Sequence, residues 1–380
     1  MKSLYATPVW WYAVGNYGLY DVWFGVSMDQ IQRRVGAIRR RLSNHRIDGL
    51  ILTKPANVTY LTGFSGEDSW AIVAKGAVYL LTDSRYTEQA RKECPRASIV
   101  ERKDPIAAAA GKLVGKLKSA KTIGVEKSIS LAQYETLKKN AEARLKAVEG
   151  LVEEQRSVKD EGETAAIRSA ASIAATAFAR AVRHARPGIT ESTLAGILDL
   201  EMRRQGAKVG FETIVAFGPN ASRPHHQPSQ RKLSQRDTIL IDFGARTNGY
   251  CCDITRSFAF GKPTTAYRRA YEVVERAQAA AIRAAKAGVE LVEVDAAARN
   301  TIRESGLLVY GHGTGHGFGL EIHEIPFLKE GAKGKLQAGQ IITIEPGIYI
   351  PGKLGVRIED DILITADGCE ILTRDCPGGK

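Results

Sequence analysis

The segment Gly311-His312-Gly313-Thr314-Gly315-His316-Gly317-Phe318-Gly319-Leu320-Glu321-Ile322-His323-Glu324 places three histidines, four and seven residues apart, in a loop rich in glycine. Two acidic segments follow it, Ile344-Glu345-Pro346-Gly347 and Arg357-Ile358-Glu359-Asp360-Asp361, each beside an apolar, β-branched run. Imidazoles and carboxylates on β-rich backbone are donors that metal sites use. The pattern therefore raises the question of whether the chain can bring these side chains together.

The composition is that of an ordinary globular protein with two domains. The chain has 380 residues, of which 44% are hydrophobic and 25% charged, enough for a sizeable core. The formal net charge is +12, but the densest basic group, around Arg39, lies mostly opposite the apolar stripe Ile31, Val35, Ile38 and Leu42. Such spacing is typical of a solvated helix face. We therefore expect no nucleic-acid partner.

Cysteine usage and the N-terminal residues indicate the compartment. Five cysteines without a Cys-x-x-Cys pair argue against a disulfide framework or a zinc finger, and favour reduced thiols in a cytoplasmic protein. Residues 1–28 lack the compact apolar core of a secretory signal, because aromatic residues, proline and glycine interrupt them. We interpret them as an extension, with an interfacial anchor as the alternative, and expect no membrane partner.

Two domains follow this extension. From 29 to 158, helical and strand patterns alternate, which is typical of an α/β domain. Helices are expected near 84–93, 105–118 and 130–140, and strands at 49–52, 70–74, 77–81, 98–100 and 122–125. A second domain is expected from 159 to 380, because Asp160 and Glu163 have capping-box spacing ahead of a long helical run.

The second domain is expected to be an internal duplication. Helix starts at 160 and 264, further helix starts at 190 and 290, and acidic strand residues at 242 and 345 repeat with a period of about 100 residues. Each half would then contribute two helices and a β-hairpin.

The first hairpin carries Asp242 on one strand and Asp253 on the returning strand. A turn at Thr247-Asn248 places the two acids directly opposite each other, and a turn at Asn248-Gly249 places them diagonally on one face. Either arrangement leaves their Cβ atoms roughly 5–8 Å apart.

The second hairpin carries Glu345 and Glu359, whose midpoint is Gly352, so these two acids also face each other. Four carboxylates that converge without a counter-ion repel one another, and divalent cations remove that conflict. A set of four carboxylates and one imidazole favours Mn, Co, Fe or Zn over a thiolate type of zinc site. Two such ions, about 3.5–4 Å apart, can hold a hydroxide nucleophile between them.

These segments resemble the M24 metallopeptidases of the pita-bread fold, in the branch that contains aminopeptidase P and prolidase. The resemblance covers residues from about 29 to 372. Its motifs are Ile241-Asp242-Phe243-Gly244, Asp253-Ile254-Thr255-Arg256, His312-Gly313-Thr314-Gly315-His316-Gly317, His323-Glu324, Glu345-Pro346-Gly347 and Arg357-Ile358-Glu359-Asp360-Asp361. The first domain resembles creatinase-type N-terminal domains more weakly, through Gly49-Leu50-Ile51-Leu52 and Tyr60-Leu61-Thr62-Gly63-Phe64.

The resemblance implies a creatinase-like N-terminal α/β domain followed by an internally duplicated α+β pita-bread catalytic domain. It also implies a set of five metal ligands: Asp242, Asp253, His316, Glu345 and Glu359. They would hold two divalent ions, Mn²⁺ before Co²⁺, Zn²⁺ or Fe²⁺. Every ligand position holds the expected residue type, whereas creatinase, which shares the fold, uses no metal and has lost ligands.

Further roles follow from the same resemblance. Glu345 would also act as general base for the bridging water. His225, in preference to His226, would line the substrate side of the cleft, and His323 would donate to the scissile carbonyl or the developing oxyanion. A separate group would shape the substrate side and orient the ligands: His312, Tyr349 and Arg357.

The function expected from this resemblance is hydrolysis of the bond between a first residue and a following proline, as in a Xaa-Pro aminopeptidase. A Xaa-Pro dipeptidase (prolidase) is the alternative, and methionine aminopeptidase ranks lower because it normally lacks this type of first domain. From another class, a non-catalytic pita-bread protein that binds RNA or a protein remains open, as does a lyase or amidohydrolase. The expected partners are small peptides with proline at the second position, and a second copy of the chain in a homodimer.

Overall fold

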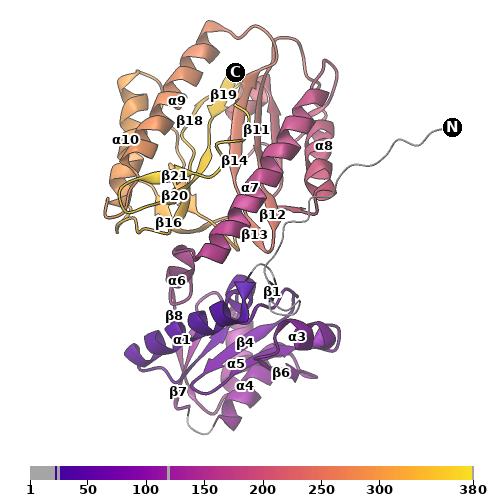
Figure 1. Cartoon of the computed structure of the whole chain (residues 1–380), viewed down its shortest axis with the longest axis vertical. Coiled ribbons are helices and arrows are strands. Elements are labelled where there is room, and N and C mark those ends of the chain that lie inside the picture. Colours follow the sequence, from indigo (N-terminus) through magenta and orange to yellow (C-terminus); the bar gives the residue numbers. More distant parts are fainter. Residues whose placement is uncertain (1–21, 24–25, 118–119, 379–380) are drawn as a thin grey trace, which may run out of the picture.

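The computed structural model describes residues 22–23, 26–117 and 120–378 (Figure 1). The interpretation of residues 1–28 as an extension falls almost wholly outside these residues. Two short strands, β1 (Val22–Trp23) and β2 (Val26–Ser27), pair ahead of the first helix. None of the helices in the described part of the chain is both long enough and apolar enough to cross a membrane.

The N-terminal domain contains a six-stranded mixed sheet in the order β6-β5-β4-β3-β7-β8. Its strands are β3 (Gly49–Leu52), β4 (Trp70–Ala74), β5 (Val78–Thr82), β6 (Ser98–Glu101), β7 (Thr122–Glu126) and β8 (Arg144–Val148). All four residues of β3 are buried, as expected for a central strand covered on both faces.

Helices cover both faces of this sheet. Leu50 and Leu52 pack against α1 (Met28–Asn44), α2 (Pro55–Thr62) and α3 (Thr87–Glu93), whereas Ile51 packs on the opposite side against α4 (Ile106–Lys116) and α5 (Leu131–Asn140). Successive side chains of a strand point to opposite faces, so the apolar run in β3 serves both layers.

The short helix α6 (Glu153–Ser157) lies between the two domains and leads into α7 (Glu161–Ala181) (Figure 1). The predicted capping box is confirmed: Asp160 accepts from the Glu163 backbone, and Glu163 accepts from the Asp160 backbone. Helix α7 pairs with α8 (Glu191–Arg204) against the sheet β10-β11-β14. The strands of this half are β9 (Lys208–Val209), β10 (Ile214–Phe217), β11 (Thr238–Phe243), β12 (Ala245–Thr247), β13 (Tyr250–Cys251) and β14 (Ile254–Ala259).

The second half repeats this plan. Helices α9 (Thr265–Ala284) and α10 (Leu291–Glu304) lie on the opposite flank of the domain from α7 and α8 (Figure 1). They pack against the sheet β16-β15-β17-β20-β21 and the ribbon β18-β19. These strands are β15 (Gly315–Gly317), β16 (Glu324–Leu328), β17 (Ile341–Ile344), β18 (Gly347–Ile350), β19 (Leu354–Arg357), β20 (Asp360–Ile364) and β21 (Cys369–Ile371). The creatinase-like α/β domain followed by a duplicated α+β domain is thus confirmed.

Candidate metal centre and active site

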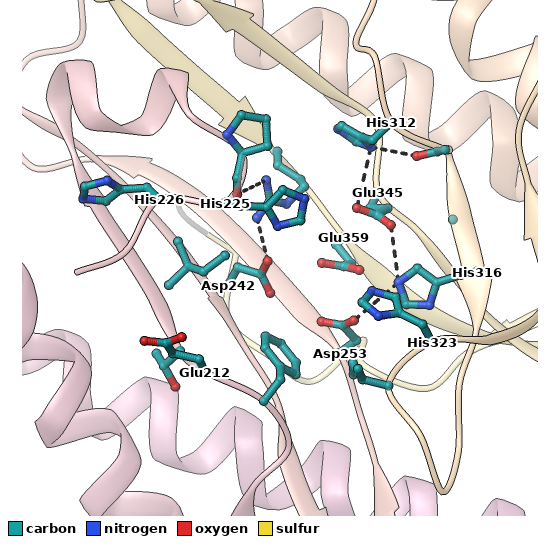
Figure 2. A pocket seen from close by; sticks show the side chains of 18 of the residues that line it. Glu212, His225, His226, Asp242, Asp253, His312, His316, His323, Glu345 and Glu359 are labelled. Atoms are coloured by element: carbon teal, nitrogen blue, oxygen red, sulfur yellow. Dashed lines mark hydrogen bonds and ion pairs between the residues drawn. The ribbon is translucent and has the colours of Figure 1, made fainter. Parts of the chain in front are cut away.

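A cavity of about 470 Å³ opens between the two halves of the second domain. Among its lining residues are all the predicted site residues except Tyr349, which lies behind Arg357: His225, Asp242, Asp253, His312, His316, His323, Glu345, Arg357 and Glu359. Figure 2 shows their imidazoles and carboxylates converging on one space. The chain thus brings together residues that lie more than a hundred positions apart.

The first hairpin adopts the second of the two turns considered. Thr247 pairs with Tyr250 around Asn248 and Gly249, whose φ angles are 49° and 80°. Asp242 consequently pairs with Thr255, and Asp253 lies diagonally across, immediately before β14. The ladder is interrupted at Gly244, where a Cβ atom would lie 2.0 Å from the Cys252 carbonyl oxygen.

The second hairpin has the predicted register. Ile344 pairs with Asp360 and Gly347 pairs with Arg357, so Glu345 lies opposite Glu359 in the interval between the two ladders. Glu359 also bridges to Thr255, whose carbonyl oxygen accepts from the Glu359 backbone at 3.1 Å. This contact joins the two halves of the domain at the site.

His316 enters the site from β15. Its Nε2 lies 3.5 Å from Glu345 Oε1 and 3.7 Å from Asp253 Oδ2. Its Nδ1 lies 3.1 Å from the Gly317 carbonyl oxygen, which requires the proton on Nδ1 and leaves a lone pair on Nε2 facing the carboxylates. The possible ligand atoms of Asp253, His316 and Glu359 all lie within 4.8 Å of one another, close enough to hold one metal ion.

The electrostatics of the site fit divalent cations. Burial, together with the neighbouring carboxylates, raises the pKa of Asp253 and of Glu359 well above their usual range. Burial raises the pKa of Glu345 to about 8, and it lowers the pKa of His316 to about 4. The site therefore holds acceptors in an environment that penalises their negative charge, and bound cations would relieve this penalty.

Asp242 supports the same conclusion. Its Oδ2 accepts from Arg357 Nη2 at 2.6 Å, but its buried Oδ1 has no hydrogen-bond partner among the described residues. A buried carboxylate oxygen normally finds a partner. A cation held among Asp242, Asp253, His316, Glu345 and Glu359 would supply one.

A directed hydrogen-bond chain borders the carboxylates. Arg357 Nη1 donates to the Tyr349 hydroxyl at 3.0 Å, and this hydroxyl lies 3.1 Å from His312 Nε2. Nδ1 of His312 lies 2.7 Å from the Gly313 carbonyl oxygen and so carries the proton. Tyr349 therefore donates to Nε2, which fixes the His312 ring, and burial lowers the pKa of His312 to about 4, so the ring is neutral.

The two adjacent histidines of the Pro224-His225-His226 run separate in space. His226 Nε2 lies 2.8 Å from Glu191 Oε2, and Figure 2 shows its ring turned away from the carboxylates. His225, which the sequence analysis preferred, faces the centre of the cavity. His323 lies on the other side, with its ring centroid 4.5 Å from that of His316.

The sequence did not point to several other residues at the site. Phe211, Glu212, Phe327 and Lys329 line the cavity, and 40% of Phe327 is exposed. Phe327 lies in β16 and Lys329 directly after it, and an alternation of two residues is too short to identify a site from the sequence. A buried arginine, Arg156, also escaped notice, although it contacts the segment that carries His323.

Comparison with known proteins agrees with this architecture. The sequence model of metallopeptidase family M24 matches residues 165–366, and that of the creatinase/prolidase N-terminal domain matches residues 34–158. A Xaa-Pro dipeptidase of Pyrococcus furiosus is 34% identical over 347 residues, covering 90% of this chain and 98% of that protein.

Two solved structures are also similar. A Xaa-Pro dipeptidase from Bacillus anthracis shares 36% identity with a TM-score of 0.88, covering 92% of this chain and 98% of its own. An X-Pro aminopeptidase from Thermotoga maritima shares 37% identity with a TM-score of 0.81, covering 88% and 97% respectively. The relatives thus include proteins named for both of the activities expected from the sequence.

Proposed function

The chain belongs to metallopeptidase family M24, and on that premise we propose that it is a Xaa-Pro aminopeptidase, an enzyme that hydrolyses the bond between the first residue of a peptide and a following proline. The observation that carries this proposal is the convergence of Asp253, His316 and Glu359 within 4.8 Å of one another. Asp242 and Glu345 line the same cavity beside them.

We propose that these five residues hold two divalent ions, with Mn²⁺ as the native metal. The donor set is rich in oxygen and contains no thiolate, which favours Mn²⁺ over a thiophilic metal and leaves Co²⁺, Zn²⁺ and Fe²⁺ as alternatives. When bound, such ions polarise the scissile carbonyl and lower the pKa of water.

Glu345 would act as general base. Its carboxylate lines the cavity beside His316, where it could take a proton from the attacking water. His312 Nδ1 lies 3.9 Å from Glu345 Oε2. Arg357 and Tyr349 would keep Asp242 and His312 in place through the hydrogen-bond chain described above.

His323 and His225 would contact the peptide. From its side of the cavity, His323 would donate to the carbonyl oxygen as negative charge develops on it. His225 would line the opposite wall, and His312 the subsite of the residue after the cut. The nitrogen of a prolyl bond has no hydrogen to donate, so ring shape and carbonyl position must be recognised instead.

A Xaa-Pro dipeptidase is the second candidate, and one observation favours it. Lys329 lines the cavity, and its ammonium lies 5.9 Å from the centroid of the exposed Phe327 ring. A cation at this position could pair with the free carboxylate of a dipeptide. Hydrolysis of a Xaa-Pro dipeptide and a Xaa-Pro tripeptide by the metal-depleted and Mn²⁺-restored protein tests both candidates.

For this experiment, we expect the chelator-treated protein to be inactive, Mn²⁺ to restore activity, and the tripeptide to be cleaved faster than the dipeptide. Preference for the dipeptide would favour the dipeptidase. Full activity without metal would overturn the assignment of the five ligands. No cleavage of either peptide by metal-loaded protein, combined with salt-sensitive RNA binding, would favour a non-catalytic binder.

We further propose a cytoplasmic homodimer whose two domains comprise residues 29–158 and 159–380. All five cysteines are free thiols, which suits a reducing compartment. The proposed boundary falls between α6 and α7. The homodimer rests on the family resemblance, and light scattering of the purified protein tests it.

A further inference from the structure

His323 has no side-chain hydrogen bond to any residue that the structure describes, although its ring faces the cavity and lies beside His316. The position of this imidazole therefore depends on the backbone that carries it. That backbone is the segment 319–324, a tight turn in which Gly319 donates to the Glu321 carbonyl oxygen at 2.9 Å. Whatever fixes this turn also fixes His323.

The beginning of the turn is held by the catalytic domain. The Cys251 backbone donates to the Gly319 carbonyl oxygen at 2.9 Å, and Arg246 Nη1 donates to the Leu320 carbonyl oxygen at 2.7 Å. These contacts end at Leu320, three residues before His323. They do not explain how the second part of the turn is fixed.

The end of the turn is held by the backbone pairing of Glu324 with Gly317 in β15 and by ionic contacts with Arg156 of α6. Glu324 Oε1 accepts from the Glu321 backbone at 2.9 Å, closing the turn around His323. The same oxygen accepts from Arg156 Nη2, which also donates to Glu321 Oε2 at 2.9 Å. One guanidinium nitrogen thus binds both carboxylates that flank His323.

Arg156 is itself fixed from the other side. It lies on α6, is only 2% exposed, and donates from Nη1 to Asn57 Oδ1 on α2 at 2.6 Å. Asn57 is fully buried and donates to Glu126 Oε1 at 2.6 Å and to Glu153 Oε1 at 2.7 Å. The planar fork of an arginine suits such a double contact, and lysine cannot reproduce it.

Two lysines also contact Glu321 and Glu324. Lys54 Nζ lies 2.8 Å from Glu321 Oε2, and the buried Lys159 Nζ lies 3.5 Å from Glu324 Oε2. Neighbouring cations lower the pKa of Glu324 despite its burial, so its carboxylate remains an acceptor at neutral pH.

We propose that Arg156 is a positioning residue of the active site: through Glu321 and Glu324 it holds the turn that places His323 over the scissile bond. The N-terminal domain thereby takes part in catalysis by fixing Arg156 through Asn57. This inference rests on the proposed function, because it assumes that His323 contacts the substrate.

A double-mutant cycle tests the proposal. The variants are Arg156→Lys, His323→Ala and the two combined, assayed on a Xaa-Pro tripeptide with saturating Mn²⁺. Arg168→Ala is the control, because Arg168 also forms an ion pair with a glutamate, Glu370, but both side chains are largely exposed. Bound metal and melting temperature are recorded for each variant.

We expect Arg156→Lys to lower kcat about 100-fold in the wild-type background, with KM and metal content nearly unchanged, because a small displacement of a reacting group has such an effect. In the His323→Ala background, the same substitution should lower kcat less than about threefold, because the group that it displaces is already gone. Arg168→Ala should leave kcat unchanged in both backgrounds.

Equal losses in both backgrounds would overturn the positioning role and leave Arg156 as a residue that only joins the domains. If Arg156→Lys does not fold, Lys54→Gln removes the partially exposed partner of Glu321 and should show a smaller loss of kcat, again only where His323 is present. Wild-type protein that cleaves no Xaa-Pro peptide would instead overturn the proposed function itself. The two failures are therefore distinguishable.

Discussion

At the scale of single residues, protons and metal ions compete for the buried carboxylates. Burial raises the pKa of Glu345 to about 8 and raises the pKa values of Asp253 and Glu359 well above their usual range. These acids stabilise the metal-free protein most when protonated, that is, at low pH, and for Glu345 this stabilisation is lost as the pH rises through about 8. Burial lowers the pKa of His316 to about 4, so its imidazole remains neutral between pH 6 and 8.

We expect the melting temperature of the metal-free protein to fall as the pH rises from about 6 to 8.5, whereas saturating Mn²⁺ should prevent most of that fall. The gap between the two melting curves should therefore widen with pH. Differential scanning fluorimetry across this range measures it. Glu345→Gln should narrow the gap, and Glu370→Gln, an exposed control, should not. A gap that is the same at every pH would contradict the proposed metal site.

Lys329 provides a second prediction at this scale. Among the described residues that line the cavity, two are lysine or arginine: Lys329 and Arg357. Arg357 already donates to Asp242. If a substrate carboxylate enters the cavity, Lys329 is its partner. We expect Lys329→Gln to reduce kcat/KM about tenfold for a Xaa-Pro dipeptide and to change it little for a longer peptide. Lys333→Gln, at an exposed position outside the cavity, serves as control.

Equal effects of Lys329→Gln on both substrates would show that this lysine does not distinguish a dipeptide from a longer chain.

Neither Lys329 nor Arg156 could be chosen from the sequence alone, because each is one of 54 lysines and arginines. The contact between Arg156 and Glu321 joins residues 165 positions apart, and no local pattern specifies such a pair.

At the scale of elements, close approach of strands shapes the site. A Cβ atom at Gly315 would lie 1.9 Å from the Thr343 carbonyl oxygen, so only glycine lets β15 lie against β17 with His316 aimed at the carboxylates. Gly311 precedes the same strand, but a Cβ atom there would meet nothing within 4 Å.

We expect Gly315→Ala to reduce the free energy of unfolding by about 1–3 kcal/mol or more, because the added methyl group must displace backbone. It should also weaken Mn²⁺ binding, since His316 moves with the strand. Urea unfolding and metal titration measure the two effects. Gly311→Ala is the matched control and should behave like wild type. A Gly315→Ala variant with wild-type stability would contradict the tight packing of these two strands.

Helix ends and hairpin registers could be predicted from the sequence where nearby residues determine them. The capping box at Asp160 and the register of Glu345 opposite Glu359 follow from spacing within one segment. The first hairpin left two registers open, because two adjacent turns were compatible with its sequence, and the left-handed Asn248-Gly249 turn decided between them. Helix α2 escaped notice because it spans only eight residues.

At the scale of the whole molecule, one apolar cluster crosses the boundary between the domains. Leu50 and Leu61 of the N-terminal domain belong to the same buried cluster as Ile167, Tyr250 and Phe318 of the catalytic domain. Polar contacts reinforce it: Arg34 lies 2.8 Å from Asp160 and 3.2 Å from Glu163. Together with the buried Arg156, this interface resembles the interior of one domain more than a flexible junction.

We therefore expect the two domains to unfold in a single cooperative transition, and metal bound in one domain to stabilise both. At Mn²⁺ concentrations about 100 times the dissociation constant, one site adds about 2.7 kcal/mol to the free energy of unfolding of the unit that binds it. Differential scanning calorimetry with and without Mn²⁺ measures whether that unit is the whole molecule. One peak that moves as a whole would agree with a shared core. Two peaks, of which only one responds to Mn²⁺, would show that the domains are energetically separate and that the N-terminal domain cannot hold Arg156 in the way inferred above.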